Sequence, residues 1–92
     1  MRQKINYENY VGRFFERETM SGSLLFYKIT GCDRKHYIVE EISLFPSSAV
    51  KEHDLKMELS LVNAENFKEI TEHDYSMAEY LFKTANRMEF NN

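Results

Sequence analysis

The chain has 92 residues, of which 42% are hydrophobic and 29% charged, with a net charge of −3 and one cysteine, Cys32. This composition suffices for a single folded domain over residues 1–92 and excludes a disordered tail. One cysteine cannot form an internal disulfide, and no segment approaches the roughly 20 apolar residues of a membrane span. We therefore expect a cytoplasmic protein without membrane insertion.

The first half of the sequence predicts strands. Residues 10–16 and 24–30 are rich in aromatic and apolar side chains. A polar loop over 31–35 joins the second of these runs to another, 36–45, and the pair predicts an antiparallel hairpin. Pro46 lacks a backbone donor and is expected to end that strand.

The segment 47–54 is polar, and we expect a short helical turn within it. Residues 55–61 then alternate apolar and polar side chains, a pattern that predicts a half-buried strand. Its core-facing positions are Leu55, Met57, Leu59 and Leu61. Residues 63–69 are predicted to be a short connection.

The segment that follows has the pattern of a helix start. Thr71 is expected to be the N-cap, and Asp74 can return a hydrogen bond to its backbone. Ile70 and Tyr75 occupy the positions of a hydrophobic staple, and the helix is predicted over 72 to about 88. The stripe expected to face the sheet comprises Tyr75, Ala78, Leu81, Phe82, Ala85 and Met88. The opposite face carries Glu72, Glu79, Lys83 and Asn86.

The order of elements predicts an α+β fold, an antiparallel sheet of about four strands with a C-terminal helix packed on one face. The strands at 24–30 and 36–45 carry apolar residues on both faces, and one helix covers only one. The N-terminal segment, curling of the sheet, or another chain must cover the second face. If another chain does so, we expect a homodimer. Its contact residues would be Leu24, Phe26, Tyr37 and Val39.

The sequence contains no complete combination of residues that indicates catalysis or metal binding. Cys32 and His36 lack a third group to complete a nucleophilic site. Glu-His-Asp occurs at 52–54 and again at 72–74, but without the spacing of metal ligands. The glycine-rich, serine-hydrolase and zinc-protease motifs do not occur. We therefore expect no enzymatic activity, no cofactor and no metal.

Aromatic residues beside basic ones could stack nucleic-acid bases, which makes a nucleic-acid-binding module the alternative function. The candidates are Tyr10, Phe14, Phe26, Tyr27 and Tyr37, with Arg13, Arg17, Lys28, Arg34 and Lys35. Residues 1–36 have seven Lys/Arg and four Asp/Glu, a charge of +3, whereas residues 37–92 have five and eleven, a charge of −6. The acidic balance and the lack of an RNP-type run argue against nucleic acid, and core packing explains these aromatics more simply.

Four short sequence segments resemble segments of small, uncharacterised proteins of phages and mobile elements of gut bacteria. They are VGRFF at 11–15, FYKITG at 26–31, VEEI at 39–42 and EITEHDY at 69–75. In those proteins a V-G-[RK]-[FY]-[FY] strand leads into a hairpin, and an E-I-T-type cap opens the last helix. The resemblance implies no catalytic residues. It favours a small accessory protein that acts by protein–protein binding, such as a phage-encoded modulator of a host factor.

Overall fold

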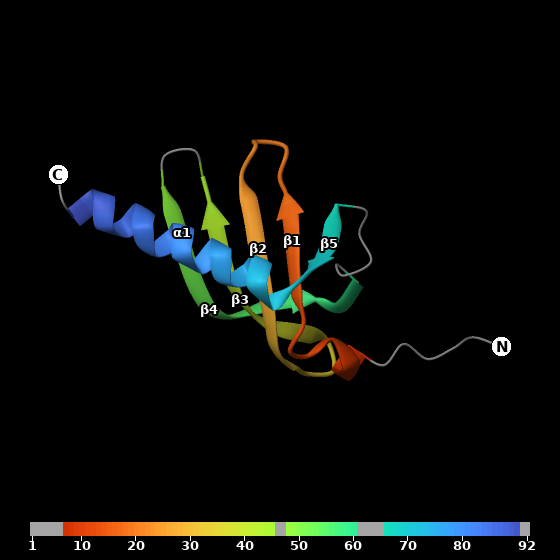
Figure 1. The fold of residues 1–92 in the computed structure, drawn as a ribbon. Helices are drawn as coiled ribbons and strands as arrows, with labels where there is room; N and C mark the ends of the chain where they lie inside the picture. Colours follow the sequence, from red (N-terminus) through yellow and green to blue (C-terminus); the bar gives the residue numbers. More distant parts are fainter. Residues whose placement is uncertain (1–6, 46–47, 61–65, 91–92) are drawn as a thin grey trace.

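The computed structural model describes residues 7–45, 48–60 and 66–90. Within them, five antiparallel strands form one sheet in the order β4-β3-β2-β1-β5, and α1 crosses one face of it (Figure 1). This confirms the predicted α+β fold, with five strands rather than four. The elements are η1 (Tyr7–Tyr10), β1 (Phe14–Glu18), β2 (Leu24–Cys32), β3 (His36–Leu44), β4 (Ala49–Glu58), β5 (Phe67–Ile70) and α1 (Glu72–Phe90).

Two segments predicted to lie outside the sheet are strands. The polar residues 49–54 form the first half of β4, which is an edge strand and therefore tolerates polar side chains on its exposed positions. The last three residues of the expected connection, 67–69, form β5 (Phe67–Ile70) together with Ile70, and this strand is too short to show an alternating pattern. The first strand begins at Phe14 rather than Tyr10, because Tyr10 ends the 3₁₀ turn η1. Pro46, Leu61 and the side chain of Met88 lie outside the described residues.

The start of α1 confirms the predicted cap. The backbone N–H of Asp74 donates to Thr71 Oγ1 at 3.1 Å, and the backbone N–H of Thr71 donates to Asp74 Oδ2 at 3.2 Å. Ile70 packs against the cluster that contains Tyr75, as a hydrophobic staple requires. These contacts lie within six residues of sequence, so local chemistry alone sets where the helix begins.

The face that α1 turns to the sheet agrees with the predicted one except at two positions. Tyr75 and Ala78 are buried as expected, but Leu81 remains 49% exposed. Glu79, which was predicted to face solvent, turns toward the sheet, and its Oε2 lies 3.2 Å from Lys51 Nζ. The helix carries apolar residues on two sides, and contacts made by the sheet decide which side is covered.

Side chains pack in separate clusters on the two faces of the sheet. The cluster beneath α1 comprises Phe26, Ile42, Tyr75 and Ala78. The larger cluster on the other face comprises Phe15, Leu25, Tyr27, Ile29, Tyr37, Val39, Met57 and Phe67. Both apolar faces predicted for β2 and β3 are therefore filled.

An irregular step in β4 allows the sheet to cover its second face. Val39 pairs with Leu55 and Glu41 with Glu52, so β4 has one residue more than β3 between these pairs. Asp54, within that step, has a φ of 56°. A bulge of this kind bends the strand and increases its twist.

The bend brings β4 over strands that are not its neighbours. Met57 of β4 packs in the same cluster as Phe15 of β1 and Phe67 of β5, although β3 and β2 lie between β4 and β1 in the sheet. Tyr10 of η1 adds to this cover, since its ring centroid is 6.2 Å from those of both Phe15 and Tyr37. Curling of the sheet and the N-terminal segment thus cover the second face together.

We predict that Thr71→Ala lowers the free energy of unfolding by about 1 kcal/mol, because the first turn of α1 loses the acceptor for a backbone N–H. Urea unfolding measures the change. Ser76→Ala, at an exposed position of the same helix, is the control and should change stability by less than about 0.5 kcal/mol. Equal losses in the two variants would contradict a capping role.

A second prediction concerns the bulge. Asp54→Val should cost about 1–3 kcal/mol more than Asp54→Gly, because a β-branched side chain opposes a positive φ that glycine adopts freely. Both variants remove the same carboxylate. The difference between their free energies of unfolding in urea therefore reports the cost of the positive φ at residue 54. Similar stabilities would show that the strand does not depend on this conformation.

Candidate functional site

A cluster of charged side chains joins α1 to the sheet at the bulge. Glu40 of β3 faces the extra residue of β4 and accepts a hydrogen bond of 2.7 Å from the hydroxyl of Tyr75. Its other oxygen, Oε1, lies 3.0 Å from His53 Nδ1 and 3.4 Å from Lys51 Nζ. Because Lys51 also reaches Glu79, these five residues form one network, which we call the Glu40 cluster.

The charges in the Glu40 cluster stabilise a structural contact between α1 and the sheet. Burial alone would raise the pKa of Glu40, but the hydrogen bond from Tyr75 and the charges of Lys51 and His53 outweigh it, so the pKa lies below its ordinary value. Burial, and then the hydrogen bond to Glu40, raise the pKa of the Tyr75 hydroxyl. At neutral pH Glu40 is therefore a carboxylate and Tyr75 a neutral phenol, and neither is poised to exchange a proton.

The four residues predicted at a partner contact differ in exposure. Tyr37 and Val39 are 0% and 1% exposed, and Phe26 is 8% exposed, so these three belong to the two cores of a single chain. Leu24 is 38% exposed. The surplus apolar face that motivated the expected homodimer is thus covered within one chain, and of the four only Leu24 presents a surface.

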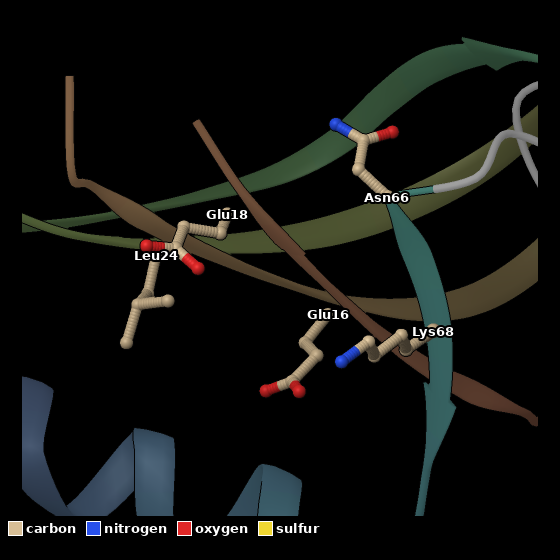
Figure 2. A pocket seen from close by; sticks show the side chains of 5 residues that line it. All are labelled: Glu16, Glu18, Leu24, Asn66 and Lys68. Carbon is tan, nitrogen blue, oxygen red and sulfur yellow. The ribbon is translucent and has the colours of Figure 1, made fainter. Parts of the chain in front are cut away.

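Leu24 lines a hollow on the helix side of the sheet, where β5, β1 and β2 lie next to one another (Figure 2). Glu16 pairs with Lys68 across β1 and β5, and Glu18 pairs with Leu24 across β1 and β2. Asn66 completes the lining. The hollow thus places an apolar side chain beside two carboxylates and one ammonium group.

The volume of this hollow, about 150 Å³, limits what it can hold. Pockets for small-molecule ligands are roughly 300–1,000 Å³. A hollow of half the lower limit can receive one side chain of another protein. The two carboxylates favour a side chain with a positive end and an apolar stem, because Leu24 can contact the stem.

The side of α1 that faces away from the sheet is also apolar. Met77, Tyr80 and Leu81 are 48%, 63% and 49% exposed, and their spacing of three and four residues places them on one side of the helix. We call them the α1 stripe. The spacing of these three residues is visible in the sequence. However, Leu81 was assigned to the stripe predicted to face the sheet, so Met77 and Tyr80 were not recognised as part of a second stripe.

Three of the five aromatic residues considered for stacking on nucleic-acid bases are not on the surface. Phe26, Tyr27 and Tyr37 are all buried. Arg13 donates to both carboxylate oxygens of Glu69, and its guanidinium carbon lies 4.3 Å from the centre of the Tyr10 ring. These aromatic residues therefore fill cores, as the simpler interpretation held.

The remaining candidate catalytic and metal-binding residues do not come together in one site. The Cys32 thiol donates to the carbonyl of Asp33 at 3.2 Å, and His36 Nδ1 lies 3.9 Å from Asp33 Oδ1. The two Glu-His-Asp copies have separate roles, since His53 contacts Glu40 while Asp74 caps α1. Across residues 7–45, 48–60 and 66–90, no group of three or more His, Cys, Asp or Glu side chains is placed to hold a metal ion.

A further hollow opens on the face opposite α1. Arg17 of β1 and Leu55 of β4 both line it, which the curl of the sheet makes possible. Tyr27 contributes to its floor, and burial, followed by a hydrogen bond and charge from Glu41, raises the pKa of its hydroxyl. A phenol held in the neutral form cannot act as a base at neutral pH.

Comparisons with protein-family models, with curated proteins and with solved structures find no match to this chain. Of the helices described, none is both long and apolar enough to cross a membrane. Conclusions about function therefore depend on the residues and surfaces described above.

We predict that Tyr75→Phe lowers the free energy of unfolding by about 1–3 kcal/mol at neutral pH, because the Glu40 carboxylate keeps its place but loses a donor. Tyr80→Phe, on the exposed side of the same helix, is the control and should be nearly neutral.

The pH dependence sharpens this test. The pKa of Glu40 is lowered in the folded protein, so its contribution is complete above the ordinary carboxyl pKa and is lost as the pH falls through the folded value. The difference between wild type and Tyr75→Phe should therefore shrink on acidification. A difference that stays constant in urea unfolding between pH 7 and pH 3 would refute this role of Glu40.

Proposed function

We propose that this protein is a non-enzymatic binding protein, and that the α1 stripe, Met77, Tyr80 and Leu81, is the surface that it presents to a protein partner. The observation that carries the proposal is the exposure of three large side chains on α1, opposite the side that the sheet covers. A helix on the surface of a globular protein ordinarily has one apolar stripe, and this one has two.

The composition of the α1 stripe supports protein binding. Methionine and tyrosine are enriched at protein interfaces, because methionine adapts to irregular surfaces and tyrosine combines a large apolar ring with a polar end. Residues spaced by three and four along a helix are the anchors of helices that bind in a partner's apolar groove. We infer a partner with such a groove.

The hollow beside Leu24 supports a partner that also carries basic side chains. It opens on the face of the sheet that α1 crosses, and Glu16 and Glu18 line it. An acidic pocket next to an apolar residue favours a lysine or arginine side chain. The net charge of −3 acts in the same direction at longer range.

The resemblance to small phage and mobile-element proteins suits this role. Small accessory proteins that modulate a host factor need a binding surface and no catalytic site. We therefore propose that this chain is a phage-type accessory protein that binds a cytoplasmic host protein. Burial of the aromatic residues Phe26, Tyr27 and Tyr37 supports this function over nucleic-acid binding.

The test compares capture of partners from a lysate of the native host by immobilised wild-type protein and two variants. Leu81→Asp places a charge within the α1 stripe and should abolish capture of a specific protein, because desolvating an unpaired charge opposes docking. Ser76→Asp places the same charge at another exposed position of α1 and should retain capture. Both variants should unfold at nearly the wild-type urea concentration.

Three results would contradict the proposal. A partner retained by Leu81→Asp does not use the α1 stripe. Capture that nuclease treatment removes, and that weakens steeply with salt, indicates nucleic acid. Self-association in sedimentation equilibrium that Leu81→Asp abolishes would assign the stripe to a second copy of this chain.

A further inference from the structure

The tip of the β2–β3 hairpin and the adjacent part of β4 form a basic hollow. Asp33, Arg34, Lys35 and His36 line it from the hairpin, and Lys56 lines it from β4. It is a shallow depression that is open to solvent, with a volume of about 510 Å³. It is separate from the α1 stripe in sequence and in its lining residues.

The charge of this hollow opposes that of the whole chain. Arg34, Lys35 and Lys56 contribute +3 and Asp33 contributes −1, so the lining carries +2 with His36 neutral, in a chain of net charge −3. No carboxylate in the described part of the chain lies within 4.0 Å of a charged nitrogen of Arg34, Lys35 or Lys56. These three positive charges thus remain available to a ligand.

The one acid of the hollow is engaged by its own loop. Asp33 Oδ1 accepts hydrogen bonds from the backbone N–H groups of Lys35 at 2.8 Å and His36 at 2.7 Å. These two bonds, and after them the charges of protonated His36 and of Lys56, lower the pKa of Asp33. Asp33 therefore stabilises the conformation of the loop. This in turn positions the backbone of Arg34 and Lys35.

Pairing between β3 and β4 brings the basic residues together. Lys56 pairs with Ile38, two positions beyond His36, so Lys56 and His36 are diagonal neighbours on one face. Glu58 pairs directly with His36 and, together with Lys56, lines the hollow on the face opposite α1. Its carboxylate should weaken the binding of an anion beside His36 and Lys56.

We propose that this basic hollow is a binding site for a phosphate dianion, either free phosphate or the phosphate monoester group of a larger compound. A ligand of charge −2 neutralises the +2 of the lining, whereas a carboxylate or a phosphate diester neutralises half of it. The guanidinium of Arg34 offers paired donors that match phosphate oxygens, and Lys35 and Lys56 add point charges. The site is independent of the α1 stripe and does not depend on its role.

The experiment follows backbone amide signals of the full chain by NMR at pH 8 while inorganic phosphate is added at constant ionic strength. We expect saturable shifts at residues 33–36 and 56. Arg34→Gln and Lys56→Gln should each weaken binding about tenfold, as expected for the loss of one charge-assisted hydrogen bond. Glu58→Gln should strengthen binding, and Lys83→Gln, which changes an exposed lysine of α1, should leave it unaltered.

A titration with methyl phosphate distinguishes a site for free phosphate from a site for a phosphorylated compound. Tighter binding of inorganic phosphate than of methyl phosphate assigns the site to the free ion, and the reverse order assigns it to a phosphorylated compound. Either result supports the proposal. Shifts that do not saturate, shifts of equal size with acetate or dimethyl phosphate, or equal weakening by Lys83→Gln would overturn it.

Discussion

The fold depends on one irregular step in an edge strand. Strands β2 and β3 carry apolar side chains on both faces, and a single helix can cover only one of them. Asp54, in a left-handed conformation, allows β4 to bend there. The second half of β4 then packs Leu55 and Met57 over the face opposite α1. A straight β4 would leave that face open to water or to another chain.

The same step determines how α1 sits. Because β4 has an extra residue opposite Glu40, His53 and Lys51 meet that carboxylate beside the hydroxyl of Tyr75. Tyr75 also packs on Phe14, with ring centroids 5.1 Å apart. The network and this packing together stabilise the observed rotation of the helix about its axis. One apolar side faces the sheet, and the α1 stripe is left exposed as a consequence.

Three surfaces of different chemistry result from this arrangement. The α1 stripe is apolar, the hollow beside Leu24 contains two carboxylates, and the tip of the β2–β3 hairpin is basic. The groups whose pKa values are most displaced, Tyr75 and Tyr27, are held in their neutral forms. This distribution supports the binding role that we propose.

Sequence alone determined the features that arise from neighbouring residues. The cap formed by Thr71 and Asp74, the β2–β3 hairpin and the alternation at Leu55 and Met57 are short-range patterns, and each was predicted. Strand β5, the first half of β4 and the exposure of Leu81 were not predicted. Tertiary structure decided these, because a polar edge strand needs a neighbour's hydrogen bonds and a two-sided helix needs a surface to select its face. The burial of Tyr37 and Val39 likewise required the bend at Asp54, which joins segments that are distant in sequence.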